Sequence, residues 1–300
     1  MSSRQSPGRP TAVSRAGRLL ERGWARCERG NRIGALDCFQ DAARIPDAAP
    51  AERAEALHAQ GAMLDALGMD GEALDAFEEL ARDYLDSLDE TIAARVDAAL
   101  GDSVVLLAGQ GRAREALDLS DRLLKRLEGS GRPGAAADEA AALCNRGTLL
   151  LKLGREREAA RCFARAARRA SLAGDADGLL HGARARNALG FVLLMRAKPR
   201  AASRRKRRGL GAALRLLGQA LDFHDDPPTV QGNQAYALFL LGRAGEARAP
   251  LSEALRVDGE RVYACEVQDA SGRSIPEDAD FLRFLADTWR EVQGTEPPAL

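Results

Sequence analysis

Hydrophobic positions recur along the chain at intervals of three and four residues, which is the spacing of one face of an α-helix. A small residue stands at the centre of each apolar stripe. In most copies a leucine precedes it by four residues and another follows it by three. The four middle copies are spaced 43 residues apart. The six central residues are Gly23, Gly61, Val104, Gly147, Gly190 and Ala235. The pattern predicts six copies of one amphipathic helix.

A second helix follows in every copy. In five copies a glycine stands seven residues after the central residue, at Gly30, Gly68, Gly111, Gly154 and Gly242. Glycine just past a helix end adopts the left-handed conformation at little cost. Five residues after this stop a new apolar stripe begins, with spacings of four and then three, as in Ala159, Phe163 and Ala166. Each copy is therefore predicted to be two helices joined by a tight turn.

The fifth copy is interrupted, because 23 residues separate Gly190 from Ala213 where the other copies take 12. The stretch from Arg196 to Arg208 contains eight Lys or Arg and no acid. We predict a solvated basic loop over 197–209 that extends by self-repulsion. The alternative is a patch for nucleic acid or an acidic partner. The candidate residues of that patch are Arg204, Arg205, Lys206, Arg207 and Arg208.

The two ends of the chain differ from the repeats. Residues 1–14 are polar and are predicted to be disordered. A last helix is predicted to start at Ile275-Pro276-Glu277 and to seal the C-terminal end of the stack. The stretch before it, "GERVYACEVQDASGRS", is ambiguous between a short helix and a loop. Residues 258–293 are thus interpreted as a capping segment, and residues 294–300 as a frayed tail.

These positions resemble the tetratricopeptide repeat family. Its motif has a bulky apolar residue, a small residue, a large residue, then glycine, alanine, an aromatic residue and alanine. The second and fourth copies match best, as "ALHAQGAMLDALGMDGEALDAFEEL" and "ALCNRGTLLLKLGREREAARCFARA". The resemblance covers residues 16–256. It implies an all-α, right-handed α-solenoid of about six helix-turn-helix repeats over 15–257, with a C-terminal capping helix. The alternative is a helical bundle without repeats.

The chain departs from the family pattern, since the proline that usually ends each repeat is mostly absent and Pro250 lies inside the last second-helix pattern. The usual period is shorter than 43 residues, so these repeats need longer helices or longer loops. Arg186 and Gln231 also stand where the family has a bulky apolar residue.

The composition argues against several classes of function for this protein. The 44 Lys and Arg balance the 44 Asp and Glu, so no global field recruits nucleic acid or a membrane surface. We attribute the excess of arginine over lysine to the composition of a GC-rich bacterial genome. The five cysteines form no CxxC pair, which favours reduced thiols in the cytoplasm over a zinc site. No run of 18 apolar residues occurs, so no membrane span is expected, and residues 1–13 lack the apolar core that is typical of a signal peptide.

No catalytic motif is evident. Gly109-x-Gly111 and Gly209-x-Gly211 lack the Lys-Ser/Thr of a phosphate-binding loop, and the chain contains no Gly-x-Ser-x-Gly elbow. The three histidines lie in different regions of the sequence. The sequence therefore predicts a protein that is not an enzyme and that carries neither cofactor nor metal.

The resemblance implies where a partner binds. In the family, the first helices of successive repeats line a concave face that commonly takes extended peptides or helices. Carried onto this chain, those positions give a candidate partner-binding set of Lys152, Arg184, Asn187, Phe191, Tyr236 and Phe239. The alternative places the two phenylalanines in the core.

We therefore expect a cytoplasmic, non-enzymatic scaffold or adaptor for a protein or peptide. Two alternatives remain open. One is a regulatory sensor that acts on a separate effector. The other is binding of nucleic acid or an acidic partner through 197–208, which the neutral charge and the absence of interleaved aromatics do not favour.

Overall fold

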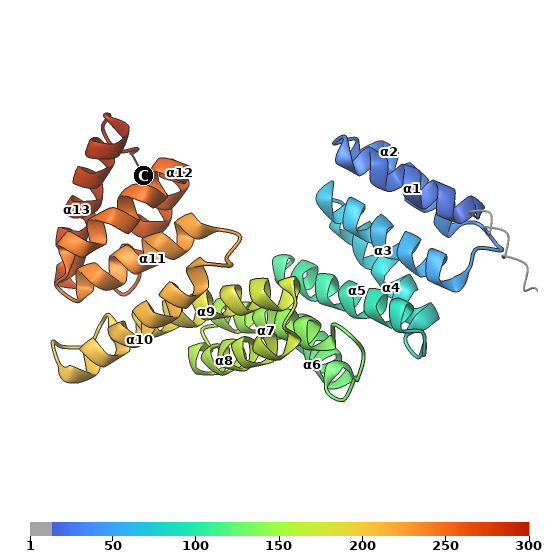
Figure 1. Ribbon diagram of the computed structural model, residues 1–300, viewed down its shortest axis with the longest axis horizontal. Coiled ribbons are helices and arrows are strands. Elements are labelled where there is room, and N and C mark those ends of the chain that lie inside the picture. The colour runs from blue at the N-terminus through green and yellow to red at the C-terminus, as the bar shows by residue number, and fades with distance from the viewer. Residues whose placement is uncertain (1–13, 300) are drawn as a thin grey trace, which may run out of the picture. The chain divides into compact units, whose positions relative to one another are not determined.

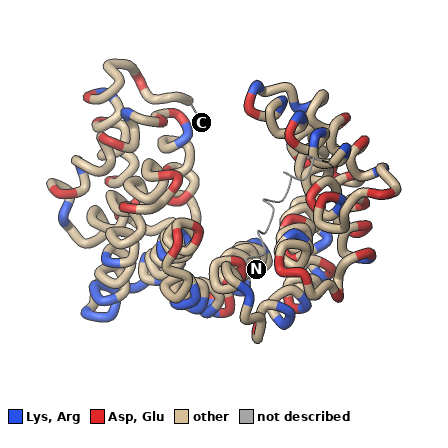
Figure 2. The backbone as a smooth tube through the Cα atoms, turned by 45° about the vertical axis from the view of Figure 1, so that its right-hand side comes forward, with Lys and Arg blue, Asp and Glu red and all other residues tan. Residues whose placement is uncertain are grey.

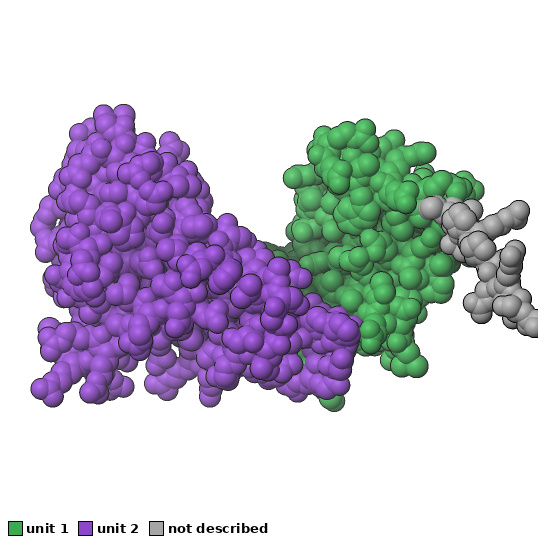
Figure 3. All heavy atoms as spheres, viewed as in Figure 1, with its two compact units in different colours: residues 1–126 green, residues 127–300 purple. Residues whose placement is uncertain are grey.

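The computed structural model describes residues 14–299, and this part of the chain forms thirteen α-helices and no strand. The chain divides into two compact units, of which the first ends at Arg126 and the second begins at Leu127 (Figure 3). The predicted disordered segment 1–14 lies outside the described residues except for Ser14, whose side chain caps the first helix. None of the helices in the described part is long and apolar enough to cross a membrane.

The first unit contains three helix pairs (Figure 1). First helices of successive pairs contact each other, as α1 contacts α3 and α3 contacts α5. The helices are α1 (Arg15–Glu28), α2 (Arg32–Ala43), α3 (Pro50–Ala66), α4 (Asp70–Tyr84), α5 (Glu90–Gly109) and α6 (Ala113–Leu127), the last of which ends one residue into the second unit.

The second unit is built in the same way. Each helix packs against the next, and α7, α9, α11 and α13 form the row of alternate helices in contact. The helices are α7 (Ala135–Lys152), α8 (Glu156–Ala173), α9 (Ala176–Ala197), α10 (Arg204–Leu221), α11 (Pro227–Leu240), α12 (Ala244–Ser271) and α13 (Pro276–Gln293). The prediction of an all-α solenoid of six two-helix repeats followed by a last helix is confirmed.

The small central residues lie where the two helices of a pair cross most closely. A Cβ atom added to Gly61 would lie 2.4 Å from Cε1 of Phe77, and one added to Gly147 would lie 2.5 Å from Cε1 of Phe163. Real Cβ atoms do not approach so closely, so the phenylalanine ring occupies the space that the missing side chain leaves. The five stop glycines are also confirmed, with φ between 72° and 76°.

The structure contains a seventh helix pair that the sequence analysis missed. Asp258 interrupts α12 with φ −148° and ψ 66°, so the helix consists of two segments. The second segment pairs with α13. Arg273, with φ 54°, follows this segment as the stop glycines follow the others. Glu266 stands seven residues before Arg273, which is where the other copies have their small central residue. Asp269 stands four residues before Arg273, which is where they have a large apolar residue. The ambiguous stretch is therefore helical through Ser271.

The basic segment differs from the prediction of a loop over 197–209. Helix α10 already begins at Arg204, because the Ser203 side chain caps it by accepting a hydrogen bond from the Lys206 amide at 3.2 Å. The Lys206 side chain is buried, and its ammonium lies 3.3 Å from the Glu277 carboxylate. Only residues 198–203 lie outside a helix here. The prediction of a solvated loop is thus wrong for the four arginines and the lysine at 204–208.

The tail after α13 also makes specific contacts. Gly294 ends the helix with φ 69°. The Trp289 indole then donates to the Thr295 hydroxyl at 3.3 Å, and the Arg290 guanidinium lies 2.9 Å from the Glu296 carboxylate. Residues 295 and 296 therefore return to the helix, while Leu300 lies outside the described residues.

Candidate functional site

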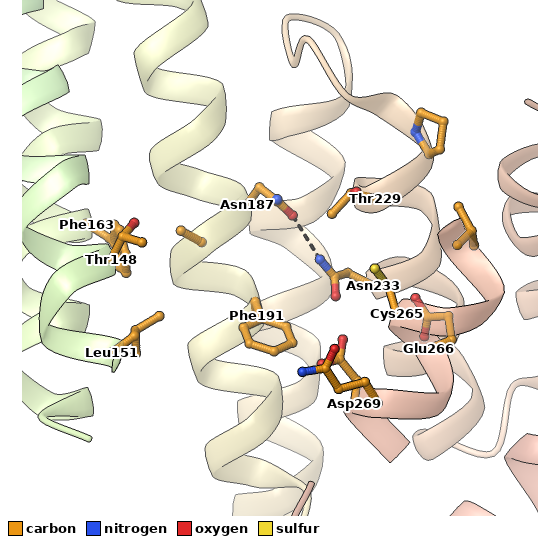
Figure 4. A pocket seen from close by; sticks show the side chains of 14 residues that line it. Thr148, Leu151, Phe163, Asn187, Phe191, Thr229, Asn233, Cys265, Glu266 and Asp269 are labelled. Carbon is orange, nitrogen blue, oxygen red and sulfur yellow. Dashed lines mark hydrogen bonds between the residues drawn. The ribbon is translucent and has the colours of Figure 1, made fainter. Parts of the chain in front are cut away.

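A pocket of about 290 Å³ lies in the second unit, between α7, α9, α11 and α12 (Figure 4). Capping residues fix the helices that form it: Asp175 accepts from the Gly178 amide at the start of α9, and Asp226 accepts from the Thr229 amide at the start of α11. The residues that line it are Thr148, Leu151, Phe163, Asn187, Ala188, Phe191, Pro228, Thr229, Asn233, Val262, Cys265, Glu266, Gln268 and Asp269.

Two asparagines and a phenylalanine form one wall of this pocket. Asn187 and Phe191 are four residues apart on α9 and so share one helix face. The Asn233 side-chain amide, from α11, donates to the Asn187 side-chain oxygen at 3.2 Å (Figure 4). This bond occupies the Asn187 side-chain oxygen and one Asn233 N–H, and it leaves the Asn187 NH2 group as a donor and the Asn233 side-chain oxygen as an acceptor. A peptide backbone presents the complementary pair, a carbonyl and an amide.

The opposite wall contains a buried carboxyl group. Glu266 is only 3% exposed, and its Oε2 has no hydrogen-bond partner among the described residues. Burial, with a smaller contribution from the nearby Asp269 charge, raises the pKa of Glu266 to about 8. The carboxyl group lies over Gly232, where a Cβ atom would be 2.2 Å from Oε1. Glycine at 232 is therefore what allows a glutamate at 266.

Asp269 lies one turn further along α12. Burial raises its pKa to about 6, and the charge of Lys198 opposes this shift. Glu266 and Asp269 thus place two protonatable carboxyl groups on the pocket wall, beside Cys265 and Val262.

A buried lysine holds the end of α12 in place. The Lys198 ammonium donates to the backbone carbonyls of Asp269, Ala270 and Gly272 at 2.8 to 2.9 Å. Two of these carbonyls belong to the last turn of α12 and the third to the residue that follows the helix, where a positive charge also complements the helix dipole. Lys198 further lies 3.1 Å from the Asp278 carboxylate.

Two of the six predicted partner-binding residues line the pocket, namely Asn187 and Phe191. Tyr236 does not, because it is fully buried: its ring stacks on Phe281 at 4.3 Å and its hydroxyl donates to Asp278 at 2.5 Å. Its assignment to the binding surface is therefore wrong. Phe239 is partly buried, and its ring lies 5.3 Å from that of Phe281 on α13.

The two remaining residues lie outside the pocket. Lys152 is exposed at the end of α7. Arg184 is paired with Asp225, with Nε and Oδ1 3.1 Å apart, and this pairing lowers the pKa of Asp225.

The sequence analysis missed Asn233 and the residues of the opposite wall, namely Cys265, Glu266 and Asp269. The signal that points to them is the positive φ of Arg273, which sets the register of the seventh pair. In that register Val262 keeps the expected apolar residue, while two carboxyl groups replace the small and the large residue. Because arginine replaces the stop glycine, a search for the repeat motif does not find this copy.

The five basic residues at 204–208 lie apart from the pocket. They belong to a stretch, 178–221, that contains eleven Lys or Arg and no acid. In Figure 2 the basic positions of α10 form a nearly continuous blue stretch at the lower left. Seven arginines of this stretch make neither an ion pair nor a side-chain hydrogen bond within the described part of the chain, and we call them the basic face: Arg196, Arg200, Arg204, Arg205, Arg207, Arg208 and Arg215.

Comparisons with known proteins bear on the fold. No protein-family model matches the chain, and no curated protein sequence matches it significantly. A tetratricopeptide repeat protein from Parabacteroides merdae is 17% identical, with a TM-score of 0.55 over 93% of this chain and 92% of that chain. A Rap protein complexed with Competence and Sporulation Factor is 15% identical, with a TM-score of 0.56 over 93% of this chain and 74% of that chain.

A third similar structure is the Rap conjugation gene regulator of the plasmid pLS20, solved in complex with the Phr* peptide. It is 13% identical, with a TM-score of 0.54 over 93% of this chain and 74% of that chain. At these identities the likeness concerns the fold.

Proposed function

Because the chain has the fold of tetratricopeptide repeat proteins, we propose that it is a non-enzymatic adaptor that binds a peptide segment in the pocket between α9, α11 and α12. The observation that carries the proposal is the Asn187–Asn233 pair, which presents one donor and one acceptor beside the Phe191 ring. Such a pair can donate to one backbone carbonyl and accept from one backbone amide of a peptide, and the ring can pack against an apolar side chain.

Two features support a peptide as the occupant. Two proteins of similar fold were solved as complexes, one Rap protein with the Phr* peptide and another with Competence and Sporulation Factor. The pocket also combines apolar side chains with a few polar groups, as ligand sites generally do. The five free cysteines favour a reducing compartment, so we place the protein in the cytoplasm, and its composition suggests a bacterium.

The experiment is selection from a library of random twelve-residue peptides displayed on phage. The enriched peptides are synthesised and their affinity is measured by fluorescence polarisation. We expect Asn187→Ala and Phe191→Ala each to weaken binding by about tenfold, which corresponds to about 1.4 kcal/mol. Phe223→Ala is the matched control, because Phe223 is 50% exposed and lies outside the pocket. If no peptide is enriched, or if all three variants bind alike, the proposal is wrong.

The regulatory alternative differs only in what binding does. A sensor changes its affinity for a separate effector when the peptide binds, whereas an adaptor holds both at once. Capture of cytoplasmic proteins with and without an enriched peptide distinguishes the two: a sensor loses or gains one partner when peptide is added.

A second candidate function is binding of a polyanion by the basic face. The specific observation is that the seven arginines of the basic face have no carboxylate partner in the described residues, although the chain as a whole is neutral. Arg204, Arg207, Arg208 and Arg215 surround Gly211 on one side of α10. Arginine without an internal partner remains available for phosphate or carboxylate groups.

Substitution tests this candidate better than deletion, because α10 is part of the packed core. The four arginines around Gly211 are changed to glutamine, and retention is measured on heparin and on a fluorescent DNA duplex at rising salt. The control changes Arg112, Arg155 and Arg243, which pair with carboxylates. Loss of retention in the first variant alone supports the candidate, and equal elution of both excludes it. Polyglutamate as a competitor separates nucleic acid from an acidic protein.

A further inference from the structure

We propose that Glu266 and Asp269 form a subsite for a protonated nitrogen of the ligand, either an ammonium or a guanidinium group. The inference rests on the proposed function, because it concerns one end of the same pocket. It adds the chemical class that this end selects, namely a cationic group.

The first support is the way in which the fold accommodates Glu266. Its position in the repeat holds glycine, valine or alanine in the six other copies. A glutamate fits only because Gly232 on the facing helix has no side chain, since a Cβ atom there would be 2.2 Å from Oε1. The packing of α11 against α12 thus leaves room for one carboxyl group, and its Oε2 atom makes no hydrogen bond within the described residues. An alanine at 266 would close the same space without burying a polar group.

The second support is the absence of an internal cation for Glu266 within residues 14–299. The buried ammonium of Lys198 is occupied by three backbone carbonyls and by Asp278. Arg261, one turn or more before Glu266 on α12, pairs with Asp226 and Asp258. A buried carboxylate left without a partner is costly, so a cation supplied from outside gains from pairing with it.

The third support is that the subsite has two acids rather than one. Asp269 lines the pocket beside Glu266, and each negative charge disfavours ionisation of the other. A cation with several N–H donors can pair with both carboxyl groups at once and removes their mutual repulsion. A neutral hydroxyl or amide supplies one hydrogen bond but does not offset the second charge.

The test uses three small probes and does not depend on finding the natural ligand. Glycine N-methylamide represents an N-terminal ammonium, n-butylammonium represents lysine and n-propylguanidinium represents arginine. Binding to the full chain is measured by saturation-transfer difference NMR at pH 7.5 and constant ionic strength. We expect at least one probe to bind the native chain, and its signal to fall at least fivefold in Glu266→Gln and in Asp269→Asn.

Glu253→Gln is the matched control, because Glu253 is an exposed acid on the same helix and lies outside the pocket. It should bind the probe like the native chain. The probe that gives the strongest signal identifies the source of the nitrogen. Equal signals in the native chain and in Glu266→Gln overturn the subsite, as does the absence of a signal with all three probes. Peptides can still be enriched in either case, so failure of the subsite is distinguishable from failure of peptide binding.

Discussion

The Lys198 ammonium lies 3.1 Å from the Asp278 carboxylate, and solvent reaches almost no part of either side chain. The two residues are far apart in the sequence. Lys198 follows α9, whereas Asp278 stands in the first turn of α13, where it also accepts from the Ile275 amide at 2.7 Å. The pair therefore joins the fifth repeat directly to the seventh helix pair.

Removal of this ammonium should strongly destabilise the second unit. In Lys198→Met, three backbone carbonyls lose the ammonium donor and the Asp278 carboxylate loses its cation, while all of them remain buried. Breaking a buried pair on one side costs roughly 3–5 kcal/mol. Urea unfolding followed by circular dichroism should show this loss. Lys152→Met is the control, because Lys152 is exposed, and a loss of equal size there would contradict the assignment.

Two glycine-to-alanine substitutions should change the stability of the folded chain in opposite directions. Gly147→Ala places a Cβ atom 2.5 Å from the Phe163 ring, so the ring or the helix must shift, which costs about 1–3 kcal/mol. Gly211→Ala lies within α10 with open space around it, and alanine should stabilise that helix by about 0.5–1 kcal/mol. Thermal unfolding of both variants checks the pair. If Gly147→Ala is neutral, the close crossing of α7 and α8 is not required.

The third repeat should tolerate an exchange of large and small residues. Val104 stands where the second and fourth repeats have glycine, and Ser120 stands where they have phenylalanine; both are buried. The large side chain is thus on the first helix instead of the second. Ser120→Phe alone should overpack this site by about 1–3 kcal/mol. Adding Val104→Gly should restore most of that loss, as a double-mutant cycle in urea would measure. Additive losses would show that the two positions do not face each other.

Stability should depend on pH through Glu266. The pKa of this carboxyl group is about 8 in the folded chain and 4.5 at its ordinary value. Below pH 4.5 both states hold the proton, so Glu266 costs nothing. Between these values only the unfolded state releases it, so stability falls as the pH rises. Above pH 8 the full cost applies, up to roughly 5 kcal/mol.

The measurement compares the native chain with Glu266→Gln in urea at pH 5, 6, 7.5 and 9. The difference in unfolding free energy between the two should shift in favour of the glutamine variant across this range. Asp269 titrates in the same direction but is present in both chains, so it largely cancels. If the unfolding free energies of the two chains change with pH in parallel, Glu266 is solvated or paired in solution.

The sequence predicts the six repeats because each depends on local, periodic signals. The glycines and phenylalanines that cross between paired helices can be recognised from spacing alone, and Gly61 with Phe77 is one such pair. Tyr236 shows the limit of this reasoning. Family position placed it on the binding surface, but the seventh pair covers it with Phe281 and Asp278. The two helices that cover Tyr236 could not be predicted, because Glu266, Asp269 and Arg273 replace the residues by which the motif is recognised in their copy.

The candidate pocket was predicted only on the side of α9. Asn187 and Phe191 follow from their place in a regular repeat, whereas Glu266 and Asp269 stand at positions that the motif reserves for apolar residues. Burial of a carboxyl group contradicts the usual pattern and so gives no periodic signal. The helical start at Arg204 was missed for a related reason: a run of like charges favours a loop, but the Ser203 cap and the apolar face of α10 override it.

Lys198 directly follows α9, and its ammonium donates hydrogen bonds to carbonyls at the end of α12. These two helices form opposite sides of the candidate pocket. The gap between them is consequently set by an internal brace before any ligand arrives. A ligand that fits this gap therefore loses no binding free energy to closing the pocket. A larger ligand is disfavoured, because the helices on either side are held in place.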